Sequence, residues 1–286
     1  MAKRWISVAA GLILVGIGGA ALYGFNFGKP LNEYHHKWEF RSGDLKELSI
    51  AFDSQASTIE FQPSADGKNS VLIEGKAKQE IIDRIGNVRV SGGALKIDMK
   101  ERFRWFNFNF GPFVNDKQHV VVTLTEEAAA ALDTLRFSTD AGSMTVNGAE
   151  ARAADFSTDA GSIRVDGFEG ETLKLHTDAG RIAGTDIRAD LNAKTDAGSI
   201  DIQHLTGTAK LSTDSGSVKL LKDDTTGADI KTDAGSVRVQ IPESYEGTFD
   251  LKTDAGSVTA PDAKGTSPEV IKVRTDAGSI RVSYTE

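Results

Sequence analysis

The feature that most constrains this chain is a tetrapeptide, Thr-Asp-Ala-Gly, which occurs eight times from residue 139 onward, once with serine in place of alanine. The copies begin at Thr139, Thr158, Thr177, Thr195, Thr213, Thr232, Thr253 and Thr275. The steps between them are 19, 19, 18, 18, 19, 21 and 22 residues. A repeat of about 20 residues is typical of solenoid proteins.

The residues around each tetrapeptide follow a fixed apolar pattern. Two and four residues before the threonine the side chains are apolar, as at Leu191 and Ala193, and five and seven residues after it they are usually apolar again, as at Ile200 and Ile202. Polar residues stand between them. This alternation predicts two half-buried strands in each repeat, one on either side of a Thr-Asp-Ala-Gly corner.

Eight such repeats supply about 16 strands, and open sheets rarely exceed about 10 strands without curling or splitting. The chain has no amphipathic helices to cover the apolar face. The sequence therefore predicts an all-β fold, a β-helix-like β-solenoid of about eight coils of 18–22 residues over residues 134–286. The alternative is a β-sandwich or barrel of successive hairpins, in which the tetrapeptide forms each hairpin turn.

Residues 46–133 are expected to form an N-terminal β-rich part, because short runs such as Leu48, Ile50 and Phe52 alternate with polar residues. The only helix expected here covers residues 126–132, with Thr125 as its N-cap. Residues 28–45 are polar without a sustained period and are expected to form a stalk.

The N-terminus predicts a membrane anchor. Lys3 and Arg4 precede residues 5–27, which carry no charge, and about 20 apolar residues are needed to cross a bilayer. Residues 1–27 are therefore expected to form a single-pass transmembrane helix, with the N-terminus in the cytoplasm and the rest of the chain extracytoplasmic. The alternative is a cleavable signal peptide, for which Gly19, Ala20 and Ala21 offer small residues at the cleavage site.

Charge and cysteine content exclude several function classes. The formal net charge of −8 argues against nucleic acid as a partner, since binding phosphates requires a basic surface. The chain has no cysteine, which excludes disulfides, thiolate catalysis and cysteine-ligated zinc. No phosphate loop, nucleophile motif or metal signature is present, so no cofactor is expected.

The tetrapeptide itself has two interpretations. In the structural one, the aspartate accepts backbone N–H bonds across the bend, the glycine adopts a positive φ, and the hydroxyls of threonine and serine satisfy backbone groups. In the functional one, a row of stacked carboxylates binds calcium, although one aspartate per coil is sparse for such a site. The row consists of Asp140, Asp159, Asp178, Asp196, Asp214, Asp233, Asp254 and Asp276.

Catalysis is a further alternative, because some carbohydrate-cleaving enzymes are β-helices with paired acidic residues in a surface groove. The outward aspartates that could serve are Asp155, Asp201, Asp229 and Asp250. The usual role of such residues is to solvate a strand face. The histidines, His35, His36, His119, His176 and His204, are scattered along the chain, and we expect no enzymatic activity.

An aromatic segment at residues 102–113 reads RFRWFNFNFGPF. One interpretation is a strand that packs an aromatic face under the first coil. The other is a loop that enters the membrane interface or binds a partner, since aromatic residues favour that depth and arginines suit anionic headgroups. The contact candidates are Arg102, Arg104, Trp105, Phe106 and Phe108.

The repeated unit, Ser138 to Val146 in its first copy (STDAGSMTV) with seven successors, resembles the bacterial β-strand-repeat "putative adhesin" family, a domain of unknown function that includes LiaG-like proteins. A degenerate copy at residues 53–61 (DSQASTIEF) places the start of the resemblance near residue 45. The resemblance implies an envelope protein outside the membrane. It provides no established activity and no catalytic residues.

Together these features predict a membrane-anchored, extracytoplasmic and non-enzymatic protein that serves in adhesion, as a scaffold or in the envelope-stress response. Its expected partners are the membrane, through the N-terminal helix, and envelope proteins or a cell-wall polymer. The alternative is a β-helix that binds or cleaves cell-wall polysaccharide.

Overall fold

The computed structural model of the chain describes residues 31–53, 56–101 and 117–285. The anchor predicted over residues 1–27 and the aromatic segment at 102–113 lie outside these residues. Within the described ranges, no helix has the length and apolar character needed to cross a membrane.

Strands make up most of the described chain, which confirms the all-β prediction. The strands are β1 (Asn32–Phe40), β2 (Glu47–Phe52), β3 (Ser57–Pro63), β4 (Asn69–Ala77), β5 (Ala94–Asp98), β6 (Gln118–Leu124), β7 (Thr134–Ala141), β8 (Met144–Glu150), β9 (Ala153–Ala160), β10 (Ile163–Ala179), β11 (Ile182–Ala197), β12 (Ile200–Thr206), β13 (Ala209–Ser215), β14 (Val218–Lys222), β15 (Ala228–Ala234), β16 (Val237–Ile241), β17 (Thr248–Ala255), β18 (Val258–Thr259), β19 (Val270–Ala277) and β20 (Ile280–Tyr284). The helices are α2 (Gln79–Gly86) and α3 (Glu126–Ala130).

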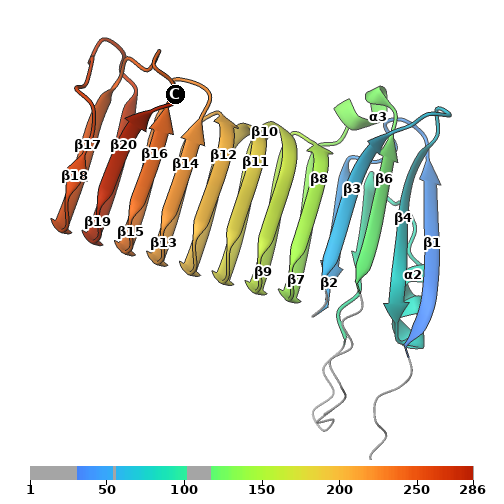
Figure 1. Cartoon of the computed structure of the whole chain (residues 1–286). Helices are drawn as coiled ribbons and strands as arrows, with labels where there is room; N and C mark the ends of the chain where they lie inside the picture. Colours follow the sequence, from blue (N-terminus) through green and yellow to red (C-terminus); the bar gives the residue numbers. More distant parts are fainter. Residues whose placement is uncertain (1–30, 54–55, 102–116, 286) are drawn as a thin grey trace, which may run out of the picture. The chain divides into compact units, whose positions relative to one another are not determined.

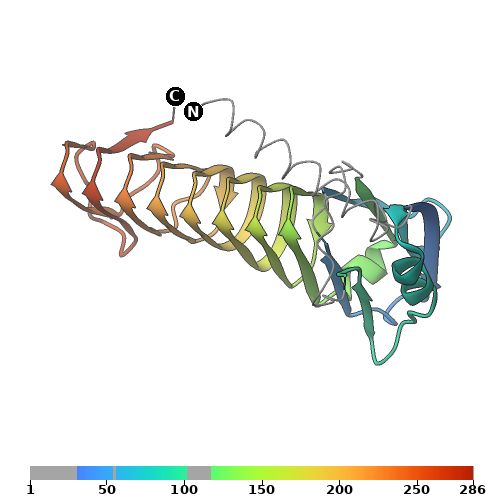
Figure 2. The same cartoon turned by 90° about the horizontal axis from the view of Figure 1, so that it is seen from below.

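Strand pairing identifies the fold as a solenoid and excludes successive hairpins. A hairpin would pair β7 with β8 in antiparallel fashion, but β7 instead pairs in parallel with β9, its equivalent in the next repeat. The strand before each corner joins one parallel ladder, and the strand after each corner joins a second one. Figure 1 shows the equivalent strands lying side by side from green to red, and Figure 2 shows the corners of the coils in line.

The core lies inside the coils and consists of the apolar positions that the sequence pattern predicts. Leu173, Leu175, Ile200 and Ile202 are each at most 1 % exposed. Because the pairing keeps equivalent residues in register, each core side chain packs on its counterpart one coil away. The aromatic rings of Phe137 and Phe156, for example, stack with their centroids 5.1 Å apart.

The two ladders continue into the N-terminal part of the chain. Strands β2 and β3 pair in parallel with β7 and β8, so the degenerate repeat near residue 53 forms one further layer. Strands β5 and β6 pair in parallel with β2 and β3 and add another layer. Beyond β6 the second ladder changes direction, since β4 and β1 are antiparallel to their neighbours.

Layers do not follow chain order at the C-terminal end. Strand β19 of the last repeat pairs with β15 on one side and with β17 on the other. In the second ladder β20 likewise lies between β16 and β18. The eighth repeat is therefore inserted between the sixth and the seventh, and the seventh forms the outermost layer. The longer connections around repeat seven allow this return.

Two expectations for the N-terminal part are corrected. Part of the expected stalk, residues 32–40, is strand β1, which pairs with β4 along its whole length and buries Trp38 to 5 % exposure. Helix α2 was not expected. It packs against the core through Ile81 and Ile85, two side chains four residues apart in a stretch too short to show a clear helical period.

The expected connector helix is confirmed as α3, which is shorter than predicted. Its N-cap is Thr125, whose hydroxyl accepts a hydrogen bond from the backbone N–H of Ala128 over 3.3 Å.

Candidate functional surface

The tetrapeptide corner is held by a ladder of hydrogen bonds between neighbouring coils. Its threonine points inward and is at most 3 % exposed in seven of the eight repeats. In the central coils the threonine hydroxyl donates to the carbonyl oxygen of the corner glycine one coil away, as Thr177 does to Gly161 over 3.1 Å. The glycine N–H donates in the other direction, as Gly161 does to the carbonyl oxygen of Ala179 over 2.9 Å.

The requirement for glycine at the corner is explained better by the close approach of neighbouring coils than by the backbone angles of this residue. The φ angle is positive and below 160° at six of the eight corners, for example 155° at Gly198, which partly confirms the predicted positive φ. The stronger constraint is spatial. A Cβ atom on Gly198 would lie 1.8 Å from the carbonyl oxygen of Gly180, a distance no real contact reaches.

The aspartates have a different role from the one expected. They point outward in one column, because the pairing places equivalent corners side by side. Among the hydrogen bonds of the described residues, none joins a corner aspartate to a backbone N–H of its bend. Five carboxylates instead lie within ion-pair distance of a basic side chain: Lys100–Asp140, His176–Asp178, Lys194–Asp196, Lys231–Asp233 and Lys252–Asp254.

These pairs bear on the calcium interpretation. A basic side chain beside a carboxylate supplies charge compensation that a shared cation would otherwise supply. Across residues 31–53, 56–101 and 117–285, no group of three or more histidine, aspartate or glutamate side chains is arranged to hold a metal ion. The Asp140–Asp276 row forms a column of carboxylates, five of which lie beside a basic side chain.

The aspartates considered for catalysis are spread over the coils. Asp155 and Asp229 lie on the first ladder in the second and sixth repeats, while Asp201 lies on the second ladder, where it accepts a hydrogen bond from Arg181 over 2.6 Å. Asp250 is hydrogen-bonded to Arg274, which lowers the pKa of its carboxyl. A general acid of glycoside hydrolysis needs a raised pKa, so Asp250 has the wrong environment for that role.

Histidines that looked scattered in the sequence meet on one sheet face. His35 on β1 and His119 on β6 both contact the carboxylate of Glu74 on β4, each over 3.3 Å. His119 also lies 3.4 Å from Glu60 on β3. The pKa of Glu74 is lowered, first by the hydrogen bond from His119. The pairing of β1, β4, β6 and β3 brings His35, Glu74, His119 and Glu60 together in one row. No local sequence signal could have revealed this row.

His35 and His119 also border a surface hollow, which is lined by Glu33, Tyr34, Glu74, Lys76 and Lys117 among others. It is shallow and open. The other three histidines contact different residues: His204 pairs with Asp223 over 3.1 Å, His176 lies beside Asp178, and His36 packs its ring against Trp38.

Lys222 is the most unusual polar residue of the core. It stands opposite Leu205 in the ladder, in a column otherwise formed by Ala149, Phe168 and Ile187, and is 1 % exposed. Its Nζ lies 2.9 Å from Asp224 and also donates to Thr226 and to the carbonyl oxygen of Gly207. Loss of water on burial lowers the pKa of this ammonium group.

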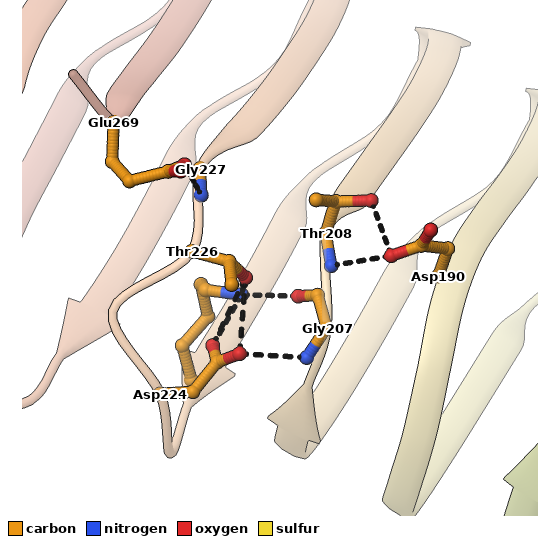
Figure 3. A network of polar contacts seen from close by, with 8 residues as sticks. Asp190, Gly207, Thr208, Asp224, Thr226, Gly227 and Glu269 are labelled. Atoms are coloured by element: carbon orange, nitrogen blue, oxygen red, sulfur yellow. Dashed lines mark hydrogen bonds and ion pairs between the residues drawn. The ribbon is translucent and has the colours of Figure 1, made fainter. Parts of the chain in front are cut away.

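Carboxylates organise the loops around Lys222. Asp224 accepts a hydrogen bond from the N–H of Gly207, and Asp190 accepts two from Thr208, as Figure 3 shows. Glu269 accepts one from the N–H of Gly227 over 2.6 Å. The network thus fastens the second connections of neighbouring coils, including the out-of-order eighth repeat. Its residues belong to the stack's internal bonding.

The contact candidates Arg102, Arg104, Trp105, Phe106 and Phe108 lie outside the described residues, so both interpretations of the aromatic segment stay predictions.

The fold and its surface define the class: a β-strand repeat protein of the parallel β-solenoid type, with polar side chains aligned on its outer faces. The sequence model of one family, described as Toastrack DUF4097, matches residues 46–283. The chain belongs to this Toastrack family. The match begins at residue 46, close to residue 45, near which the resemblance to the adhesin family was expected to begin, and it confirms that resemblance.

Several solved structures match the chain at low sequence identity. A "putative adhesin" from Bacteroides fragilis shares 15 % identity over 90 % of this chain and 98 % of its own, with a TM-score of 0.49. A "putative lipid binding protein" from Parabacteroides distasonis shares 16 % over 88 % and 97 %, with a TM-score of 0.44. A "putative adhesin" from the same organism shares 14 % over 87 % and 97 %, with a TM-score of 0.36. No curated protein matches the chain. These likenesses are too remote to transfer a function.

Proposed function

We propose that this chain is a non-enzymatic adhesion or scaffold protein of the cell envelope, which presents the outer faces of its solenoid to a partner. The observation that carries the proposal is the alignment of polar side chains in columns. Three residues before each corner threonine, one outward column runs through Arg136, Asp155, Lys174, Asn192, Lys210, Asp229, Lys272 and Asp250 in order of pairing.

Such a column suits an extended partner. Neighbouring strands are about 4.8 Å apart, so charged and amide groups recur at a fixed spacing along the stack. A polymer or protein surface that follows the stack can make many weak contacts at once, and linked weak contacts give a high combined affinity. The bonded corners described above keep the columns aligned.

The proposed location rests on the N-terminus. Lys3 and Arg4 before the uncharged stretch of residues 5–27 favour a membrane anchor with the solenoid outside the cytoplasm. An exported solenoid faces the cell wall and other envelope proteins, which are the partners we propose. A part in the envelope-stress response is compatible with this location.

The second candidate is a polysaccharide-binding or polysaccharide-cleaving β-helix. The aligned columns favour binding as readily as they favour adhesion. Cleavage has less support, because it requires two carboxyl groups about 5–9.5 Å apart, one with a raised pKa. Asp155 and Asp229 stand four coils apart, and the Asp250 carboxyl has a lowered pKa.

The proposal is tested by photo-crosslinking the full chain in its native envelope. A photoreactive residue replaces Lys210 on the first ladder or Lys219 on the second, both exposed, and the control carries it at Glu127 on α3. We expect capture of a wall polymer or envelope protein from one ladder and not from the control. Equal capture at all three sites, or none, would contradict surface recognition.

A reducing-sugar assay on wall polymers separates the two candidates. Binding without release of reducing ends is the expected result. Release of reducing ends by the full chain would replace the adhesion proposal with the cleavage alternative.

A further inference from the structure

The seventh repeat leaves one end of the solenoid open. In the described part of the chain, β17 and β18 have pairing partners on one side only, β19 and β20. Val258 is 46 % exposed, and Phe249 and Leu251 are only partly buried. At the equivalent positions one layer further in, Ile271, Val273 and Ile280 are at most 1 % exposed. Apolar side chains at this end therefore lack the cover that a further coil gives elsewhere.

The opposite end of the stack is built differently and is a poor source of that coil from another molecule. Helix α2 packs against β1 and β5 there and buries Ile81 and Ile85. The second ladder ends on the antiparallel strands β4 and β1 rather than on a parallel edge. Head-to-tail stacking of two copies is therefore disfavoured, which favours a two-fold self-association at the open end.

The free edge of β17 presents unpaired backbone groups. The N–H of Thr248 donates to the carbonyl oxygen of Glu269 over 2.9 Å, on the β19 side. Because N–H and C=O groups alternate in direction along a strand, those of Asp250 and Lys252 also face β19. The groups of Phe249, Leu251 and Thr253 consequently face the open edge.

For a two-fold antiparallel pairing of this edge with itself, charge favours the register centred on Leu251 over its two neighbours. Centring the pair on Leu251 places Asp250 opposite Lys252 of a second copy, twice, and brings the two Leu251 side chains together on the core side. Centring it on Asp250 or on Lys252 instead places like charges opposite each other. Opposite charges across a strand pair stabilise it, and like charges destabilise it.

We infer that two copies of this chain associate through the open edge of β17, paired antiparallel and centred on Leu251. The pairing joins the first ladders of the two copies into one continuous sheet and covers the apolar side chains of the seventh repeat. Edge strands that avoid pairing carry proline or inward-pointing charges. The inward residues of β17 are Phe249, Leu251 and Thr253, and the strand contains no proline.

The test uses the full chain in mild detergent, with sedimentation to measure its mass. We expect a dimer for the natural chain and a dissociation constant raised at least about tenfold for Asp250→Lys and for Lys252→Asp. An equimolar mixture of these two variants restores both charge pairs and is expected to form a heterodimer. Matched controls are Asp229→Lys and Lys231→Asp, the equivalent positions on the interior strand β15, which should leave the dimer unchanged.

Two further variants keep the proposal falsifiable if Asp250→Lys fails to fold, since Asp250 also bonds Arg274. Leu251→Pro removes an N–H that faces the open edge and should abolish the dimer while the fold is retained. Leu251→Cys introduces the only cysteine of the chain and should be linked to its copy by a short bis-maleimide. A natural chain that is monomeric at tens of micromolar, or a dimer unaffected by these substitutions, would overturn the inference.

Discussion

The hydroxyl of Thr213 donates a hydrogen bond over 3.0 Å to the carbonyl oxygen of Gly198, the corner residue of the neighbouring coil. The same bond recurs between Thr195 and Gly180 and between Thr232 and Gly216. The threonine and glycine of the tetrapeptide therefore bond neighbouring coils together: threonine provides the donor, and glycine provides the acceptor and the room for close approach.

Replacing Thr213 with valine tests this bond, because valine keeps the shape of the buried side chain and removes only the donor. We expect the free energy of unfolding to fall by about 1–2 kcal/mol, measured by urea denaturation followed by circular dichroism. Thr213→Ser retains the hydroxyl and serves as the control. If the serine variant proves less stable than the valine variant, the methyl group and not the hydrogen bond matters at this corner.

Replacing Gly198 with alanine tests the close approach. The new Cβ would meet the carbonyl oxygen of Gly180 at 1.8 Å, so the coils must move apart and lose corner hydrogen bonds. We expect a loss of at least about 3 kcal/mol or failure to fold. Gly86→Ala is the control, because nothing lies within 4 Å of its Cβ position and its φ is not positive. A melting temperature of Gly198→Ala equal to that of the control would refute the argument.

Calcium tests the remaining interpretation of the aspartate column. Because Lys194, Lys231 and Lys252 already lie beside their aspartates, we expect millimolar calcium to leave the melting temperature unchanged. A ligand that binds only the folded state raises stability in proportion to the logarithm of its concentration. A melting temperature that climbs steadily with calcium in scanning calorimetry would establish a cation site in the column.

Lys222 predicts a dependence of stability on alkaline pH. Burial lowers the pKa of its ammonium group below the usual 10.5, so the unfolded chain binds the proton more readily than the folded one. The cost of burying the charge is constant below the folded-state pKa and is relieved as the pH rises from that pKa toward 10.5.

The stability of the natural chain, relative to Lys222→Met, should accordingly rise across this window. The measurement is urea denaturation of both proteins at several pH values. A stability difference that stays constant or falls with increasing pH would contradict a lowered pKa for Lys222.

The inward positions of each coil could be predicted from the sequence, because burial on one strand face imposes a two-residue period that is visible locally. The role of the aspartates was predicted wrongly, since a turn preference does not reveal whether a carboxylate faces the backbone or a neighbouring lysine. Lys222 was missed because its apolar surroundings come from other coils. The meeting of His35 with His119 likewise depends on β4, which pairs with the strands of both residues.

The order in which the coils stack could not be predicted from local sequence patterns, for a related physical reason. Equivalent strands of different repeats are so alike that each can pair with several others. The charges of the outward column do indicate the stacking order. If the repeats stacked in chain order, Asp229 would lie next to Asp250, whereas the inserted eighth repeat places Lys272 between them. Lys272 lies 3.9 Å from Asp229, and Arg274 of the same strand bonds Asp250. Alternating charge thus favours the observed order.

The observed stacking order predicts which strands exchange their amide hydrogens fastest. A stack in chain order predicts the opposite ranking. In a sequential stack the last repeat forms the exposed end, and its amide hydrogens exchange fastest. Here β19 and β20 are bonded on both sides, while β17 and β18 are bonded on one. We expect peptides within residues 270–284 to exchange at least about tenfold more slowly than peptides within 248–259, because protection follows the local free energy of opening.

Hydrogen exchange with mass spectrometry measures this difference, and the Lys252→Asp variant is the appropriate protein because it removes any protection of β17 by a second copy. Peptides of β13, an interior strand bonded on both sides, provide the reference for full protection. Strand β19 should match that reference although it lies close to the C-terminus, because its threonine and glycine complete the same corner bonds as the interior coils. Exchange that quickens steadily from β13 through β17 to β19 would instead indicate that the repeats stack in chain order.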